Sequence, residues 1–236
     1  MSKTFSFLLA ALLAAGAQAQ VITIDQNKAL AGGVTPGDAP GFPVTISQPG
    51  SYRLTGNLNV PSHNYGAIQV TTEGGVTLDL GGFVVRGTRC SGTLCNIITP
   101  EVHGISGVNV RIHDGWIENF AGWGFYATLG GFRTVIERVF VANNGSGGIA
   151  ASGYSLVQDS RITQNQGIGL TMLSGIVRGN VIAGNTQAQL RGSNGTVLVS
   201  GNTLLGPVPF DANGTAGPIS MNDNVCAATY ANGQRC

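Results

Sequence analysis

The sequence predicts an all-β fold, a parallel β-solenoid of about seven or eight coils with a cap at each end. Three observations lead to this prediction: a repeat of about 22 residues, an apolar and polar alternation of period two within each repeat, and an unusual composition. Of the 236 residues, 37 are glycine and only 10% are charged. Glycine and β-branched residues disfavour helices, so this composition indicates short strands joined by tight turns.

The repeat is clearest in two stretches with the same pattern, GIVRGNVIAG at 175–184 and VLVSGNTLLG at 197–206. Extending the match in both directions gives steps of 24, 22, 20, 22 and 22 residues. The aligned segments are 112–116, 136–140, 158–162, 178–182 and the positions around Asn202 and Asn224. One such unit cannot bury its apolar face alone, so we expect stacked copies in which each strand pairs with its equivalent one coil later.

Stacking places the residues of one alignment column above one another, about 4.8 Å apart. Asn180, Asn202 and Asn224 form one such column. The alignment also predicts a second column: Asn119, Asn143, Asn165 and Asn185. Both are interpreted as structural ladders, because Asn tolerates the left-handed backbone of a corner and its amide can hydrogen-bond to the amide above.

The chain also resembles a known family in the segments PGSYRLTGNL (49–58) and VTLDLGGFVVRG (76–87), and in its Gly-Asn corners. These features are similar to those of bacterial secreted right-handed parallel β-helix proteins, the architecture of pectate lyases. The resemblance covers roughly residues 45–226 and implies a single-stranded right-handed β-helix. It specifies no activity, because this architecture is shared by lyases, hydrolases, epimerases and adhesins.

The N-terminal segment predicts export. Lys3 precedes an apolar run, and a small-x-small site ends at Ala19, which is typical of a signal peptide over 1–19 that is cleaved after Ala19. We therefore expect a secreted or periplasmic protein without a membrane span, since no stretch has the about 20 apolar residues that a span needs. The predicted parts of the mature chain are an N-terminal cap (20–50), the β-helix (51–225) with an inserted loop (88–99), and a C-terminal cap or tail (226–236).

Four cysteines form two close pairs in the sequence, and export decides how they are interpreted. In an oxidising compartment we expect the local disulfides Cys90–Cys95 and Cys226–Cys236. A metal site is the weaker alternative, because no Cys-x-x-Cys or Cys/His cluster accompanies these residues. Without residues 1–19 the chain has 11 basic and 11 acidic residues and no basic block, which argues against nucleic acid or an anionic membrane as partner.

The candidate site lies in the column one place before Asn180. This column is predicted to hold His113, Glu137 and Asp159 on three successive coils. Adjacent carboxylates can raise the pKa of one another or bind a cation, and a nearby arginine can neutralise a uronate. The candidate catalytic residues are His113, Glu137, Asp159 and Arg138, and the candidate substrate-binding residues beside them are Asp114 and Arg161.

Two further interpretations of this column stay open. In lyases of this architecture, as the resemblance implies, acidic residues on consecutive coils hold Ca²⁺ and a basic residue abstracts a proton. Ca²⁺ is therefore the candidate cofactor, although no catalytic role carries over residue by residue. The alternative is that these residues form cross-strand salt bridges on a solvated face. The other histidines, His63 and His103, have no aligned partners and are interpreted as loop residues.

Aromatic residues crowd into the stretch that follows Asp114. Trp116 is aligned with Phe140 and Ile162, so we expect its ring in the core. Trp123 and Tyr126 fall off the buried register and are candidate substrate-binding residues beside the charged column, because an aromatic plane can stack on the C–H face of a sugar.

These observations predict a protein that binds, and could process, extracellular polysaccharide or a cell-surface glycan. The alternative is a non-catalytic surface or periplasmic interaction protein that uses the solenoid as a scaffold. A mature chain of 217 residues leaves little length for the long loops that usually wall a lyase groove, which favours weak or absent catalysis. The sequence leaves open whether the protein is an enzyme.

Overall fold

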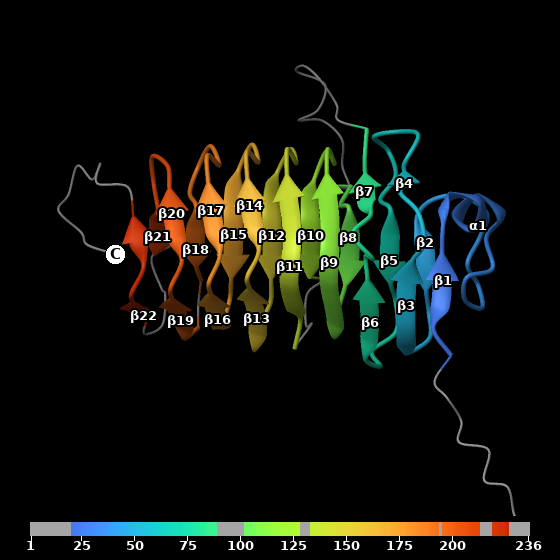
Figure 1. Ribbon diagram of the computed structural model, residues 1–236, viewed down its shortest axis with the longest axis horizontal. Coiled ribbons are helices and arrows are strands. Elements are labelled where there is room, and N and C mark those ends of the chain that lie inside the picture. Colours follow the sequence, from blue (N-terminus) through green and yellow to red (C-terminus); the bar gives the residue numbers. More distant parts are fainter. Residues whose placement is uncertain (1–19, 89–101, 128–132, 194, 213–218, 227–236) are drawn as a thin grey trace, which may run out of the picture.

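The chain forms an elongated stack of parallel strands with one short helix at its N-terminal end (Figure 1). The computed structural model describes residues 20–88, 102–127, 133–193, 195–212 and 219–226. Within these residues the fold is a parallel β-solenoid of about seven turns, which confirms the predicted fold class.

The strands stack in three rows, which form the three faces of the solenoid. The first row is, in order of pairing, β1 (Ile22–Ile24), β3 (Gly50–Leu54), β6 (Val76–Asp79), β9 (Val110–Glu118), β11 (Val135–Ala142), β13 (Ser155–Gln158), β16 (Gly175–Arg178), β19 (Val197–Ser200) and β22 (Ile219–Asn222). The second row shares the long strands β9 and β11 and adds β4 (Leu58–Asn59), β7 (Val84–Arg86), β14 (Arg161–Thr163), β17 (Val181–Ala183), β20 (Thr203–Leu205) and β23 (Val225–Cys226).

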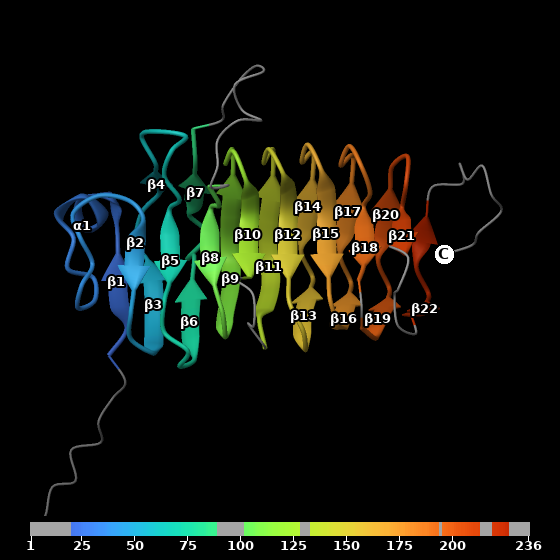
Figure 2. The ribbon, with the colours of Figure 1, turned by 180° about the vertical axis from the view of Figure 1, so that it is seen from behind.

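The third row is a separate sheet, seen in front in Figure 2. It consists of β2 (Val44–Ile46), β5 (Ile68–Val70), β8 (Ile105–Gly107), β10 (Trp123–Ala127), β12 (Gly147–Ala151), β15 (Ile168–Met172), β18 (Leu190–Gly192) and β21 (Phe210–Ala212). The core lies between the rows, because alternate residues of each strand point inward. One inward column of the first row is almost completely buried: Leu78, Ile112, Ile136, Val157, Val177 and Val199.

The first and second rows meet at a corner of left-handed backbone. Asp114, Arg138 and Asp159 occupy this corner on successive turns, with φ of 60°, 52° and 50°. Gly179 and Gly201 follow with φ of 65° and 62°. Left-handed backbone costs a non-glycine residue about 1 kcal/mol, and Asp tolerates it better than most residues. The corner therefore fixes where the inward and outward alternation restarts along each turn.

An asparagine ladder lies directly after this corner. Asn180 donates from Nδ2 to Asn202 Oδ1 at 3.0 Å, and Asn202 donates in the same way to Asn224 Oδ1 at 3.0 Å. The Oδ1 atom of each residue also accepts from a backbone N–H of the preceding turn; for Asn180 this donor is Ser160 N, at 3.0 Å. The ladder thus pairs buried backbone groups at a corner where the strands themselves are interrupted.

The second ladder is shifted by one position from the predicted column at its N-terminal end. Asn144 donates from Nδ2 to Asn165 Oδ1 at 3.0 Å, and Asn165 donates to Asn185 Oδ1 at 2.9 Å. Asn119 and Asn143 instead occupy the preceding position, with φ of 64° and 58°. The prediction that placed them in this ladder is wrong, because these two residues form the corner and do not follow it.

A single shift of register explains this error. The inward column steps from Ile136 to Val157, which is 21 residues and not the 22 of the predicted alignment. Glu137 therefore pairs with Gln158, and Asp159 falls in line with Arg138 at the corner. The predicted column of His113, Glu137 and Asp159 is correct for the first two residues only. Because side chains alternate along a strand, a one-residue shift exchanges inward and outward positions.

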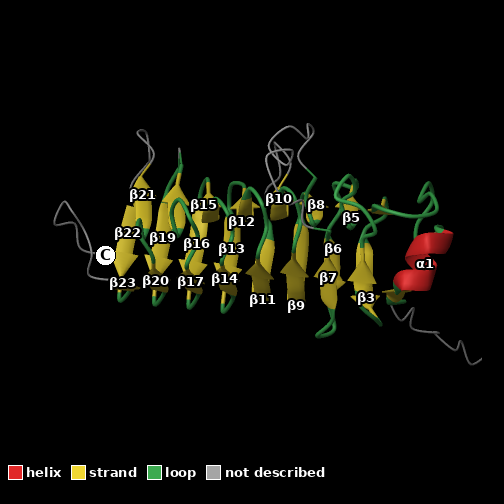
Figure 3. Cartoon of the chain, turned by 90° about the horizontal axis from the view of Figure 1, so that it is seen from above, coloured by secondary structure: helices red, strands yellow, loops and turns green. Residues whose placement is uncertain are grey.

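The two ends of the stack differ from its middle. Helix α1 (Gln26–Ala31) lies at the N-terminal end of the stack in Figure 3. In the sequence it joins strands β1 and β2, which pair with β3 and β5 of the next turn. Asp25 caps the helix, since its side chain accepts from Lys28 N at 2.9 Å. No helix among the described residues is long and apolar enough to cross a membrane.

Several predicted features lie outside the described residues. These are the signal peptide over 1–19, nearly all of the inserted loop at 88–99, and the tail after residue 226. Cys90, Cys95 and Cys236 lie in these segments, so both disulfides stay predictions. The boundaries of the caps likewise stay predictions.

Replacement of Asn180 by alanine tests the ladder. The change removes the acceptor of Ser160 N and the donor to Val157 O and Asn202, which leaves buried polar groups unpaired. We expect the free energy of unfolding to fall by about 3 kcal/mol, measured by urea denaturation. Asn64→Ala, on an exposed loop, is the control and should change it by less than about 0.5 kcal/mol. Equal effects of the two variants would contradict a stabilising ladder.

Candidate functional site

A column of polar side chains runs across six turns of the first face. Strand pairing aligns Arg53, Asp79, His113, Glu137, Gln158 and Arg178, and we call this set the charged column. Several neighbours within it are in contact. Arg53 Nε lies 3.3 Å from Asp79 Oδ2, and Arg178 Nε donates to Gln158 Oε1 at 2.8 Å. Gln158 in turn donates from Nε2 to Glu137 Oε2 at 2.7 Å, so the polar network extends from turn to turn.

Glu137 is the most enclosed carboxylate of this column. Its side chain is 6% exposed, and Arg111 donates to Oε1 from Nε at 3.0 Å and also from Nη2. The Nη1 atom of Arg138 lies 3.5 Å from the same oxygen. The pKa of Glu137 is lowered, chiefly by the hydrogen bonds from Arg111 and against the opposing effect of burial. Glu137 is therefore an ionised acceptor that two arginines hold in place.

A second group forms at the corner where the charged column meets the second face. Arg138 donates to both oxygens of Asp114, from Nε to Oδ1 at 2.6 Å and from Nη2 to Oδ2 at 2.9 Å. The Nδ1 atom of His113 lies 2.7 Å from Asp114 Oδ2 and 3.7 Å from Asp79 Oδ1. We call Asp79, His113, Asp114 and Arg138 the corner cluster.

Paired charges set the protonation states of the corner cluster. The pKa of Asp114 is lowered to about 2, mainly because Arg138 donates hydrogen bonds to it. The pKa of Arg138 is raised by the same pair. Both groups are solvated, so their attraction is screened and stabilises the fold little. The consequence for function is that Asp114 is an anion at any physiological pH.

The structure separates the two remaining charged residues of the predicted site from this cluster. Asp159 occupies the corner one turn beyond Arg138, and in the described part of the chain it forms no ion pair. Arg161 lies on the second face, with its guanidinium carbon 6.0 Å from the centroid of the Phe140 ring. His113, Glu137, Asp114 and Arg138 are thus brought together, whereas Asp159 and Arg161 are not.

Sequence reasoning missed five members of the network: Arg53, Asp79, Arg111, Gln158 and Arg178. Asp79 and His113 pair directly although 34 positions separate them, which is longer than the repeat. The extra residues of the segment between β7 and β8 lengthen this turn, so an alignment of fixed period did not reveal the pairing. Gln158 was hidden by the one-residue register shift, and its alignment with Arg178 was the available signal.

Three side chains of the corner cluster could provide ligands to a metal ion. One ligand atom each from Asp79, His113 and Asp114 lies within 4.8 Å of the other two. Ca²⁺ prefers six to eight oxygen ligands. Here one donor is a nitrogen, both oxygens of Asp114 accept from Arg138, and Asp79 Oδ1 accepts from Gly81 N at 2.8 Å. The described residues therefore fit Ca²⁺ poorly, and a mixed nitrogen and oxygen set is closer to the preference of Zn²⁺.

Trp116 lies on the surface, contrary to the predicted core position. Its exposed fraction is 43%, and its ring centroid lies 4.4 Å from that of Phe140, with an angle of 37° between the planes. The residue after Phe140 in this outward column is Arg161 and not Ile162. The corner explains the difference: after Asp114 the inward position is taken by Gly115, whose missing Cβ would lie 2.3 Å from Leu80 Cβ.

Trp123 and Tyr126 lie on the third face, away from the charged column. The Tyr126 ring stacks on His103, with centroids 4.2 Å apart and planes at 8°. Trp123 N donates to His103 Nδ1 at 3.1 Å. His103 is thus a packed support for β10, in contrast to the unpartnered loop residue that was predicted. Neither ring lies beside the charged column, so the predicted combination of these groups is wrong.

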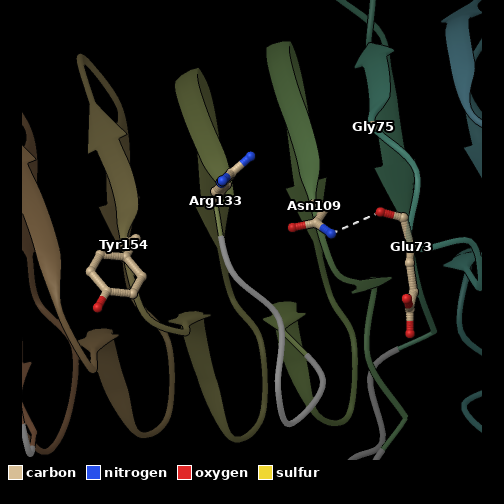
Figure 4. Close-up of a pocket in the computed structure, with 5 residues that line it drawn as sticks. All are labelled: Glu73, Gly75, Asn109, Arg133 and Tyr154. Carbon is tan, nitrogen blue, oxygen red and sulfur yellow. Dashed lines mark hydrogen bonds between the residues drawn. The ribbon is translucent and has the colours of Figure 1, made fainter.

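Two hollows lie on the surface at corners of the solenoid. The first has a volume of about 560 Å³ and lies where the strands of the first row begin (Figure 4). Glu73, Gly75, Asn109, Arg133 and Tyr154 line it, and Asn109 Nδ2 donates to Glu73 O at 2.8 Å. The second has a volume of about 590 Å³ and lies at the corner before the third row, beside Trp123.

Comparisons with known proteins add no assignment to this geometry. No family model, no curated protein and no solved structure matches the chain.

His103 gives a prediction for the pH dependence of stability. Burial lowers its pKa to about 4 from an ordinary value of 6.5. Between these values the unfolded chain binds a proton that the folded protein does not, so stability falls as the pH falls from 6.5 towards 4. The loss is on the order of 3 kcal/mol when complete.

Urea denaturation across this pH range measures the effect. His103→Gln keeps an acceptor for Trp123 N but cannot titrate, so we expect its stability to fall less than that of the native protein between pH 6.5 and 4.5. Protons that Asp114 and Glu137 bind on unfolding affect both proteins alike, so the difference between the two curves isolates His103. Parallel curves for the two proteins would contradict a buried neutral His103.

Proposed function

We propose that the protein is exported and binds an extracellular polysaccharide at the corner cluster and the adjoining ring of Trp116. The observation that carries this proposal is that the corner cluster and the Trp116 ring both reach the surface beside one exposed glycine turn. Gly82 N donates to Asp114 O, and Trp116 N donates to Phe83 O, so the Gly81-Gly82 turn lies between the cluster and the ring. A Cβ built on Gly82 would meet no atom within 4 Å.

The Trp116 ring packs against Phe140 of the following turn and is 43% exposed. Its column neighbour in the preceding turn is the smaller Val84. Part of the indole is therefore accessible to a ligand. A sugar that stacks its C–H face on the indole would place its hydroxyl groups towards the carboxylates and the guanidinium of the corner cluster.

The charge states favour binding over hydrolysis. A glycosidase needs a protonated carboxyl group as general acid, which usually has a raised pKa. The pKa values of Asp114 and Glu137 are both lowered by arginines. Paired, ionised carboxylates can accept hydrogen bonds from hydroxyl groups, but they are poor proton donors at neutral pH.

One contact supports a second candidate function, the β-elimination of a uronate polymer. His113 lies 2.7 Å from Asp114 Oδ2 through Nδ1, an arrangement that orients an imidazole as general base. Arg138 lies close enough to pair with the carboxylate of a uronate. In this reaction His113 takes the proton α to the carboxylate, and the C–O bond to the leaving sugar breaks to form an unsaturated product that absorbs ultraviolet light.

A binding assay with acidic and neutral polysaccharides tests the proposal. We expect Trp116→Ala to weaken binding about 10-fold, because it removes the stacking surface. Arg138→Gln should weaken binding of acidic chains by a similar factor, because it removes the cation at the corner. Tyr65→Ala, an exposed aromatic residue elsewhere on the chain, is the matched control and should leave affinity unchanged.

The outcomes separate the candidates. Unchanged binding by Trp116→Ala places the polysaccharide elsewhere and rejects the corner site. An ultraviolet-absorbing product that disappears in His113→Gln supports β-elimination. If no polysaccharide binds at all, the non-catalytic surface or periplasmic interaction protein becomes the better account.

A further inference from the structure

We infer that the hollow beside Trp123 is a second glycan site, separate from the corner cluster, and that it binds an uncharged polysaccharide chain along the axis of the solenoid. The hollow lies on the opposite side of the second row from the corner cluster, where the turn enters the third row. Its polar and aromatic lining consists of Trp123, Ser146, Gln166, Thr186 and Gln187. This inference does not depend on the proposed function of the corner cluster.

The hollow extends over four successive turns. Backbone hydrogen bonds stack the corner of each turn on the one before: Ser146 N donates to Gly122 O at 3.0 Å, and Gln187 N donates to Gly167 O at 3.0 Å. Equivalent residues therefore recur at the strand spacing of about 4.8 Å, which gives a length of about 14 Å. A groove that runs along the stack and presents hydroxyl or amide groups on three successive turns suits an extended chain with a repeating unit.

Glycine makes the floor of the groove. A Cβ on Gly145 would lie 2.2 Å from Ala121 O, and one on Gly167 would lie 1.8 Å from Ser146 O. Both positions exclude any side chain, because the backbones of neighbouring turns are in direct contact there. At these two positions the floor of the groove is therefore main chain without side chains.

Trp123 is a fixed wall of this groove. A Cβ on Gly147 would lie 2.4 Å from its Cζ3 atom, so the indole packs against the backbone of β12. His103 accepts a hydrogen bond from Trp123 N at 3.1 Å and anchors the main chain beneath the ring. A ring that is already immobilised loses little conformational entropy when a sugar stacks on it.

The chemistry of the margins favours an uncharged ligand. Gln166 and Gln187 are exposed, and each side-chain amide offers two donors and an acceptor, which suits hydroxyl groups that both donate and accept. No described residue that lines the groove carries a charge. An acidic sugar, a nucleic acid or a sulfated chain would find no compensating cation here, whereas a neutral hexose or pentose polymer needs none.

Titration calorimetry with neutral oligosaccharides (glucan, mannan, xylan and galactan) and with uronate oligosaccharides as the comparison tests the inference. We expect at least one neutral oligosaccharide to bind with an affinity that changes little between low and high salt. The double variant Gln166→Ala/Gln187→Ala should weaken it at least 10-fold, and Trp123→Ala should weaken it further. Gln69→Ala, an exposed glutamine on β5 of the same face, is the control and should bind as the native protein does.

The double variant keeps the test valid if Trp123→Ala fails to fold, since both glutamines are at the surface. A neutral oligosaccharide held in this groove loses affinity in the glutamine double variant and keeps it in Trp116→Ala, whereas a chain held at the corner cluster does the reverse, so failure of the corner site and failure of this groove give different results. Undiminished affinity in the glutamine double variant overturns the inference. So does binding of uronate chains or an extended peptide, but no neutral oligosaccharide, to this groove.

Discussion

The parallel pairing of each strand with its equivalent one turn later is the constraint on which the rest of the molecule depends. It satisfies backbone groups along the faces, and at two corners, where the strands break, the buried ladders that contain Asn180 and Asn165 satisfy them through side-chain amides. Because pairing is in register, the residues of one column lie above one another along the axis. Side chains of one column therefore contact each other from turn to turn.

The charged column illustrates how this constraint concentrates function in a chain that is poor in charge. Side chains that are more than 20 residues apart in sequence meet at strand spacing, and each carboxylate finds an arginine or an amide on a neighbouring turn. The same proximity holds Glu137 and Asp114 ionised. A network that neutralises its own charges is better suited to hydrogen-bonding a polar ligand than to donating protons.

Corners, more than faces, provide the candidate binding surfaces. At one corner the left-handed Asp114 turns its carboxylate towards Arg138 and resets the alternation so that Trp116 points outward. At the other, Gly145 and Gly167 allow the main chain of successive turns to approach closely beside Trp123. The two corners differ in charge, which is why we assign an uncharged glycan to the second corner only.

The sequence by itself determined the solenoid and the ladder of Asn180, Asn202 and Asn224, because in that region every turn of the solenoid has the same length of 22 residues. It also brought His113 and Glu137 together. It could not determine the register across Ile136 and Val157, where one residue fewer in a turn moves Asp159 to the corner and Asn143 out of the ladder. Nor could it place Asp79 beside His113 or Trp116 on the surface. Those features depend on loop length and on where the backbone bends, and these are settled only when hydrogen-bonded strands and a packed core fix which side of each turn faces inward.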